Sequence, residues 1–212
     1  MYWHVSTSVS HVQVVVAGCG GDCRAYRLAL PPHITVFHLD FPPVIAYRAR
    51  VLAGAAPRCT VVDVSCDLSQ PTWPAVLVGS GYDASSPALW VLEGVLPYLT
   101  PGQISLFLEA IGSLCCAGSR LTGDVQNTHY QSAPSTAAFR AVWAEYGAPF
   151  VSGTDDPAAR VAEYGFTTCH VVQQPEYAVL HGYALPEALQ LVRSHQPTAP
   201  LPRSLFFTAI KP

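Results

Sequence analysis

Charged residues are scarce in this chain, and neither sign dominates. Only 12% of the 212 residues are Asp, Glu, Lys or Arg, against a typical share of about 25%. The 11 basic and 14 acidic residues give a formal net charge of −3. Nucleic-acid binding needs a basic surface, so this composition argues against a nucleic-acid partner. Low charge combined with 50% hydrophobic residues also excludes intrinsic disorder and a coiled coil.

Long apolar runs, a basic leader and metal-binding cysteine pairs are also missing from the sequence. Runs such as 12–17 end at glycine or proline, well short of the roughly 18 residues that a membrane span needs. The first ten residues lack the basic region of a secretory signal. The seven cysteines include no Cys-x-x-Cys pair, and the eight histidines are scattered, which argues against a structural zinc site. We therefore expect a reduced, cytoplasmic protein that has no metal and does not contact a membrane.

The order of the predicted elements indicates an α/β fold. Strand-like runs at 12–17, 34–39, 60–64, 88–92 and 120–125 alternate with helical patterns at 22–30, 43–52, 73–78 and 101–114. A polar loop at 126–135 precedes a helix with Phe139, Val142, Trp143 and Tyr146 on one face, and a short helix follows at 155–165. Two last strands, 166–172 and 205–210, flank a helix that starts at Pro186 and a loop at 196–202. This order predicts a doubly wound, Rossmann-like sheet of seven strands, mostly parallel with the last strand antiparallel. We expect one domain over 1–212, with a cofactor-binding half at 1–125 and a substrate-side half at 126–212.

Glycines and acidic residues follow four successive predicted strands. They are Gly18 and Gly20 after the first, Asp40 after the second, Asp67-Leu68 after the third and Glu93 after the fourth. In a doubly wound sheet, ligands bind beyond the carboxyl ends of the strands, where glycine lets a cofactor approach the backbone. Each feature alone has an ordinary explanation: a tight turn, a helix cap at either aspartate, or a solvated glutamate. Their occurrence together predicts a nucleotide site.

The glycine spacing bears on which nucleotide is bound. A dinucleotide loop needs a third glycine for the pyrophosphate and the helix, and Cys23 occupies that position. The acidic cluster also suits a cationic ligand better than a polyphosphate, and S-adenosyl-L-methionine carries a sulfonium and an ammonium group. The sequence therefore favours S-adenosyl-L-methionine and disfavours an NAD-dependent oxidoreductase.

Four segments resemble the motifs of the leucine carboxyl methyltransferase family, in the same order and at the same spacing. They are VVVAGCGGDCRAYRL, FHLDFP, DLSQPTWPAVL and WVLEGVLPYLT. The resemblance implies an S-adenosyl-L-methionine-dependent methyltransferase, closest in character to actinobacterial members of the family. It implies roles for seven residues: Gly18 and Gly20 against the methionine part of the cofactor, Asp40 at the ribose hydroxyls, Asp67 and Leu68 at the adenine, Glu93 near the ammonium group or the substrate, and Tyr98 in the pocket.

The sequence departs from the family pattern in two places. Cys19 and Cys23 stand in the glycine loop where the family has Ala and Thr, so we expect the site to be sensitive to alkylation. Only eleven residues precede Val12, where family members carry a helical segment that covers the cofactor. The resemblance thus implies a reduced member of the family, or one in which another element closes the site.

The function expected from the sequence is O-methylation of a carboxylate or hydroxyl group on a small molecule or peptide. A hydroxyl acceptor would benefit from a general base, and His129 in the polar loop is the candidate, although an ordinary surface histidine also explains it. The alternative is a catalytically weak, truncated protein of the same fold that acts as a cofactor-binding or partner subunit. Without the helical segment that covers the cofactor in family members, apolar surface would be exposed, and this would also favour a homodimer.

Overall fold

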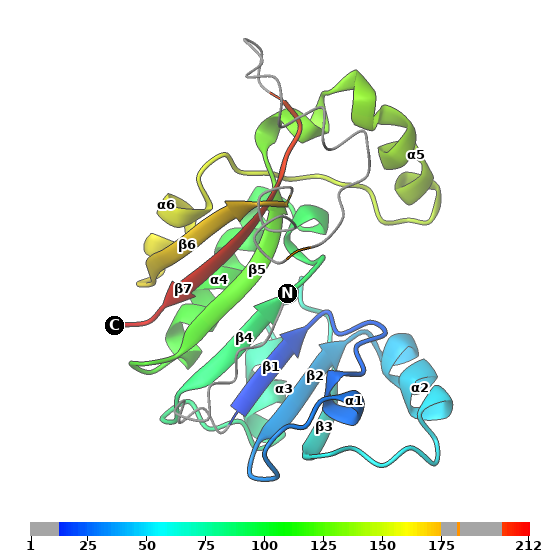
Figure 1. Ribbon diagram of the computed structural model, residues 1–212, viewed down its shortest axis with the longest axis vertical. Coiled ribbons are helices and arrows are strands. Elements are labelled where there is room, and N and C mark those ends of the chain that lie inside the picture. Colours follow the sequence, from blue (N-terminus) through cyan, green and yellow to red (C-terminus); the bar gives the residue numbers. More distant parts are fainter. Residues whose placement is uncertain (1–12, 175–181, 183–200) are drawn as a thin grey trace.

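A seven-stranded sheet organises the computed structural model, which describes residues 13–174, 182 and 201–212. In chain order its strands are β1 (Gln13–Ala17), β2 (Thr35–Asp40), β3 (Thr60–Ser65), β4 (Ala88–Leu92), β5 (Arg120–Gln126), β6 (Thr167–Gln173) and β7 (Ser204–Ile210). In space they follow the order β3-β2-β1-β4-β5-β7-β6. The first five strands pair in parallel, and β7 is antiparallel to both β5 and β6 (Figure 1). The predicted fold class, including the antiparallel last strand, is confirmed.

Helices cover both faces of the sheet. On one face, Phe37, Trp90 and Leu121 pack with α3 (Trp73–Gly79) and α4 (Pro101–Leu114). On the other face, Val14 and Val36 form a second cluster beside α1 (Arg24–Arg27) and α2 (Pro42–Val51). Because β1 is covered on both faces, its residues are apolar at successive positions rather than at alternate ones. The body of β1 is therefore closed to a ligand, and the loop after the strand is the part that a ligand can reach.

The helices that follow β5 are joined by irregular segments. They are α5 (Ala137–Glu145) and α6 (Pro157–Ala162). Three 3₁₀ turns, η1 (Leu96–Tyr98), η2 (Thr128–Gln131) and η3 (Pro134–Thr136), occupy stretches in which the sequence pattern predicts no helix. The helix predicted after the polar loop is present as α5. The four side chains of its predicted apolar face are each more than a third exposed: Phe139, Val142, Trp143 and Tyr146.

One predicted helix is too long, and another lies outside the described residues. The helix expected over 22–30 is a single turn, Arg24–Arg27, so that prediction is wrong in length. Leu28 leaves the helix with extended backbone, and Leu30 is buried in the core before the chain turns into β2. The helix expected from Pro186 and most of the loop at 196–202 lie outside the described residues. Within the described ranges, no helix is long and apolar enough to cross a membrane.

Candidate functional site

A cleft lies at the carboxyl ends of the strands where the strand order reverses. The reversal point is β1, which pairs with β2 on one side and with β4 on the other. The cleft has a volume of about 460 Å³, within the range typical of small-molecule sites. It is lined by Gly18, Asp40, Phe41, Cys66, Asp67, Leu68, Ser69, Gly94, Val95, Tyr98, Leu99, Gln103, Gly147 and Ala148. Five of the sequence-predicted site residues, Gly18, Asp40, Asp67, Leu68 and Tyr98, thus meet in one cavity.

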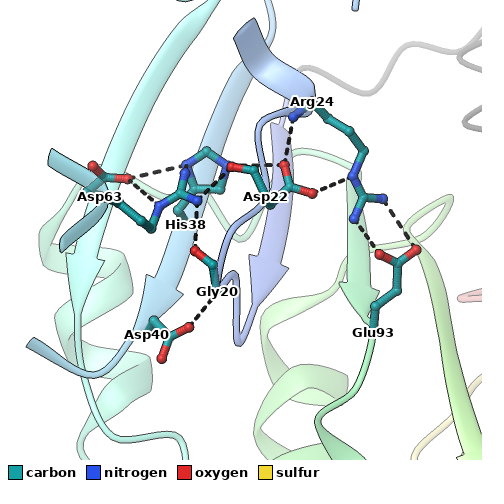
Figure 2. Close-up of polar contacts among 8 residues, drawn as sticks. Gly20, Asp22, Arg24, His38, Asp40, Asp63 and Glu93 are labelled. Carbon is teal, nitrogen blue, oxygen red and sulfur yellow. Dashed lines mark hydrogen bonds and ion pairs between the residues drawn. The ribbon is translucent and has the colours of Figure 1, made fainter. Parts of the chain in front are cut away.

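The glycine loop is tightly fixed at its two ends. Gly18 has a φ of 65°, and a Cβ atom there would lie 2.6 Å from Cγ2 of Val95, the residue that follows the β4 turn. Gly20 does not line the cleft, but its N–H donates a hydrogen bond to Oδ2 of Asp40 over 2.7 Å (Figure 2). The loop therefore packs against the β4 end and is bonded to the acid at the end of β2.

The two aspartates of the cleft are held by backbone groups but keep accepting capacity. Oδ1 of Asp40 accepts from the N–H of Phe41 over 2.8 Å. Oδ1 of Asp67 accepts from the N–H and the hydroxyl of Ser69. Each carboxylate oxygen can accept more than one hydrogen bond. Both aspartates can therefore take hydroxyl or amino donors from a ligand while they stay oriented.

Glu93 has a partner that sequence reasoning missed. The Arg24 guanidinium forms ion pairs with Glu93 and with Asp22, which places it between the β1 loop and the end of β4 (Figure 2). Glu93 itself is outside the residues that line the cleft. Burial alone would raise the pKa of the Asp22 carboxyl, but the His38 ring, with Nε2 3.7 Å from Oδ1, and hydrogen bonds from the N–H and guanidinium of Arg24 hold it well below its usual range. An opposite-charge pair thus lies beside the cleft.

Asp124, at the end of β5, is a second group that sequence reasoning missed. Its Oδ1 accepts from the N–H of Gly94 over 2.7 Å. Burial, with a smaller effect from Glu93, raises the pKa of this carboxyl. Burial, then the negative charge of Asp124, also raises the pKa of Tyr98. The available signal was an acid at the end of a fifth strand, the position that singled out the other four groups.

The two pocket candidates do not lie together. Tyr98 lines the cleft and stacks on Phe150, with ring centroids 5.1 Å apart. His129 belongs to η2 and is not among the residues that line the cleft. Its neighbour Tyr130 reaches the same aromatic cluster through an edge contact with Phe150. The aromatic cluster therefore leads from Tyr98 towards the loop that holds His129.

Comparisons with known proteins agree with this geometry. The family model described as leucine carboxyl methyltransferase matches residues 4–112, just over half of the chain. The chain belongs to the leucine carboxyl methyltransferase family. A Mycobacterium tuberculosis relative, designated an S-adenosyl-L-methionine-dependent methyltransferase, is 34% identical over 209 residues, which cover 94% of this chain and 66% of the relative. A Mycobacterium marinum relative with the same designation is 40% identical over 142 residues, covering 64% of this chain and 46% of the relative.

Solved structures share the fold at low sequence identity. A protein from Streptomyces avermitilis superposes with a TM-score of 0.68 at 15% identity, covering 99% of this chain and 79% of that one. A geranyl diphosphate methyltransferase in complex with S-adenosylmethionine gives a TM-score of 0.61 at 13% identity, covering 99% and 82%. The Mycobacterium tuberculosis and Mycobacterium marinum relatives are thus designated S-adenosyl-L-methionine-dependent methyltransferases, and the chain itself matches the leucine carboxyl methyltransferase model. The chain spans only about two thirds of the length of the first of these relatives.

The residues of the cleft fit that cofactor. Asp40 and Asp67 offer carboxylate acceptors for hydroxyl and amino donors, and Leu68 offers an apolar surface. The described lining residues include no Lys or Arg. Across the described residues there is also no group of three or more His, Cys, Asp or Glu side chains that could hold a metal ion.

Proposed function

We propose that this chain binds S-adenosyl-L-methionine in the cleft and transfers the methyl group to a carboxylate or hydroxyl oxygen of a small molecule or peptide. One observation carries the proposal: Gly18, Asp40, Asp67, Leu68 and Tyr98, which come from four separate strand ends, line a single cavity. A cavity of about 460 Å³ with few but convergent polar groups is typical of a cofactor site.

Each residue receives a role from its chemistry. Asp40 accepts hydrogen bonds from the ribose hydroxyls, and Asp67 with Leu68 holds the adenine. Gly18 lines the cleft with its backbone and packs closely on Val95, so the methionine part lies along that backbone. Glu93 and Arg24 already pair with each other, and together they complement the ammonium and carboxylate groups of an amino acid.

The protein's part in the reaction is alignment and exclusion of water. When bound, the cofactor supplies a methyl group on a positively charged sulfur. An in-line displacement needs the acceptor oxygen held against that group in a dry site, and Tyr98 is placed to form one wall of it. A carboxylate acceptor is already ionised and needs no base, whereas a hydroxyl acceptor gains from one. For that case Asp124, which accepts from the N–H of the cleft residue Gly94, joins His129 as a candidate.

A second proposal is a partner subunit of low activity, or a homodimer. The exposed apolar face of α5 favours it, because Phe139 and Tyr146 are 50% and 80% accessible and contiguous apolar surface marks interaction sites. Sedimentation velocity at high protein concentration tests this proposal. We expect a concentration-dependent dimer, and a monomer at all concentrations would remove the homodimer.

Transfer of a radiolabelled methyl group from S-adenosyl-L-methionine tests the main proposal. Suitable acceptor probes are benzoate, phenol and a tripeptide with a free carboxyl terminus. We expect labelled product with the wild type and with Glu109→Gln, which removes an exposed acid on α4. Asp40→Asn should reduce the rate at limiting cofactor by about 10- to 100-fold, because a hydrogen bond to a charged group contributes about 1.5–3 kcal/mol. Cofactor binding without transfer to any probe would instead favour the partner-subunit proposal.

A further inference from the structure

Helix α2 buries an arginine and leaves two of its large apolar side chains exposed. Arg48 is 3% accessible, and it is the one buried residue of this helix. On the same helix Tyr47 and Val51 are more than half exposed. Removing a guanidinium from water is unfavourable by several kcal/mol unless it is paired and hydrogen-bonded. Core packing therefore does not explain why arginine occupies this position.

The Arg48 guanidinium donates to the backbone of the glycine loop. Its Nη1 atom donates to the carbonyl of Gly20 over 2.9 Å and to the carbonyl of Asp22 over 2.6 Å. The N–H of Gly20 donates in turn to Oδ2 of Asp40. Gly20 is thus held from both sides, by an arginine behind the loop and by an acid that lines the cleft.

A buried histidine holds the other end of the guanidinium. Nη2 of Arg48 lies 3.1 Å from Nδ1 of His38, which is fully buried. Nε2 faces Oδ1 of Asp22 at 3.7 Å. Asp63 supplies negative charge nearby, with its Oδ1 atom 4.0 Å from Nε of Arg48 and 3.2 Å from Nδ1 of His38 (Figure 2).

We propose that Arg48 is a positioning residue that fixes the turn from Gly20 to Asp22 in its cofactor-binding shape, with His38 and Asp63 holding the guanidinium in place. The inference rests on the proposed function, since it concerns the same cleft. The fixed turn orients Asp40 through Gly20. It also orients Glu93 through Asp22 and Arg24. Displacing the loop by about 1 Å would misplace these acids, and errors of that size cost enzymes up to about 100-fold.

Variants at two positions of α2 test the proposal. Arg48→Met keeps the aliphatic volume and removes the donors, whereas Arg48→Lys keeps a donor and the charge. Arg50→Met is the matched control, because Arg50 is exposed two residues further along the same helix. In calorimetric titrations with S-adenosylhomocysteine we expect Arg48→Met to weaken binding at least tenfold. Arg48→Lys should recover part of the affinity, and Arg50→Met should bind like the wild type.

Hydrogen exchange followed by mass spectrometry supplies a readout that does not need the cofactor. In Arg48→Met we expect faster exchange in residues 18–24, with β4 and β5 unchanged. Faster exchange across the whole sheet would overturn the proposal, because Arg48 would then merely support the fold. Binding and loop exchange both equal to the wild type would overturn it as well. If the wild type binds no S-adenosylhomocysteine, the proposed function fails, and the exchange of residues 18–24 still decides whether Arg48 fixes the turn.

Discussion

Gly18 and Gly20 both have positive φ angles, 65° and 45°, but their surroundings differ. A Cβ atom on Gly18 would overlap Val95, whereas one on Gly20 would meet no atom within 4 Å. The left-handed conformation costs a non-glycine residue roughly 1–2 kcal/mol, and overpacking adds roughly 1–3 kcal/mol. We expect Gly18→Ala to lower the free energy of unfolding through both the left-handed backbone and the overpacking. Gly20→Ala should lower it through the left-handed backbone alone. Urea denaturation measures the difference, and equal losses would contradict the packing of Gly18 on Val95.

The carboxyl group of Asp22 makes the free energy of unfolding depend on pH. Its pKa is lower in the folded chain than the usual value of 3.8, so its contribution is complete above about pH 4 and is lost as the pH falls below that value. We expect Asp22→Asn to be less stable than the wild type by about 2 kcal/mol at pH 7. The difference in the free energy of unfolding between Asp22→Asn and the wild type should become smaller at pH 3. Urea denaturation at both pH values checks this, and a gap that stays constant would show that the Asp22 charge is not stabilised by its partners.

The thiols of the glycine loop differ in reactivity. The expectation that both sensitise the site is wrong for Cys19, because it is buried and burial raises its pKa to about 12, whereas the reactive form is the thiolate. Cys23 is exposed. We expect N-ethylmaleimide to modify Cys23 in the native protein at pH 7.5 and to spare Cys19, as located by tandem mass spectrometry. Labelling of Cys19 first would contradict the buried position of that thiol.

Residue positions at strand ends could be predicted, whereas pairings between strand ends could not. Asp40, Asp67 and Gly18 lie at or just beyond the carboxyl ends of strands, so the order of elements alone brings them to one edge of the sheet. The pair Arg24–Glu93 joins residues 69 positions apart. The contact of Arg48 with Gly20 depends on how α2 is rotated on the sheet. Neither distance is encoded in local spacing, so both contacts had to come from the structure.

Among the elements, α4 is the one whose start the sequence predicts most completely. Thr100 and Gln103 form a capping box, in which the Thr100 hydroxyl accepts from the Gln103 N–H and the Gln103 side chain accepts from the Thr100 N–H. Thr72 precedes α3 but makes no such side-chain bond. We expect Thr100→Ala to lower the free energy of unfolding by about 1 kcal/mol and Thr72→Ala to lower it by less. Thermal denaturation of both variants checks this, and equal effects would contradict the cap.

Helices α1 and α2 show where element-level patterns fail. The apolar residues after Arg24 continue a helical pattern, but the chain must return to the sheet at Ile34, so α1 ends after one turn. The boundaries of α2 agree with the pattern, yet its buried residue is a charged one. Patterns of apolar residues locate helices, but they do not show which polar side chain becomes buried through contacts with other elements.

For the whole molecule, the sheet order accounts for the position of the cleft. β1 is central and pairs with β2 and β4, so the loops after these strands diverge and leave space between them. The sequence predicts this arrangement because right-handed crossovers between parallel strands allow few alternatives. The segments after β5 have weaker patterns, so the arrangement of their side chains is not predicted in the same way. The aromatic cluster of Tyr98, Tyr130 and Phe150 became apparent only in three dimensions.

Calorimetric titration of the purified chain with S-adenosylhomocysteine, beside Asp40→Ala and the control Glu109→Gln, tests the central claim most directly. The account predicts one site per chain in the wild type and in Glu109→Gln, and affinity at least tenfold weaker in Asp40→Ala. A folded wild-type chain that binds no S-adenosylhomocysteine would contradict the account. So would a folded Asp40→Ala variant that binds as tightly as the wild type, because the cofactor would then lie outside this cleft.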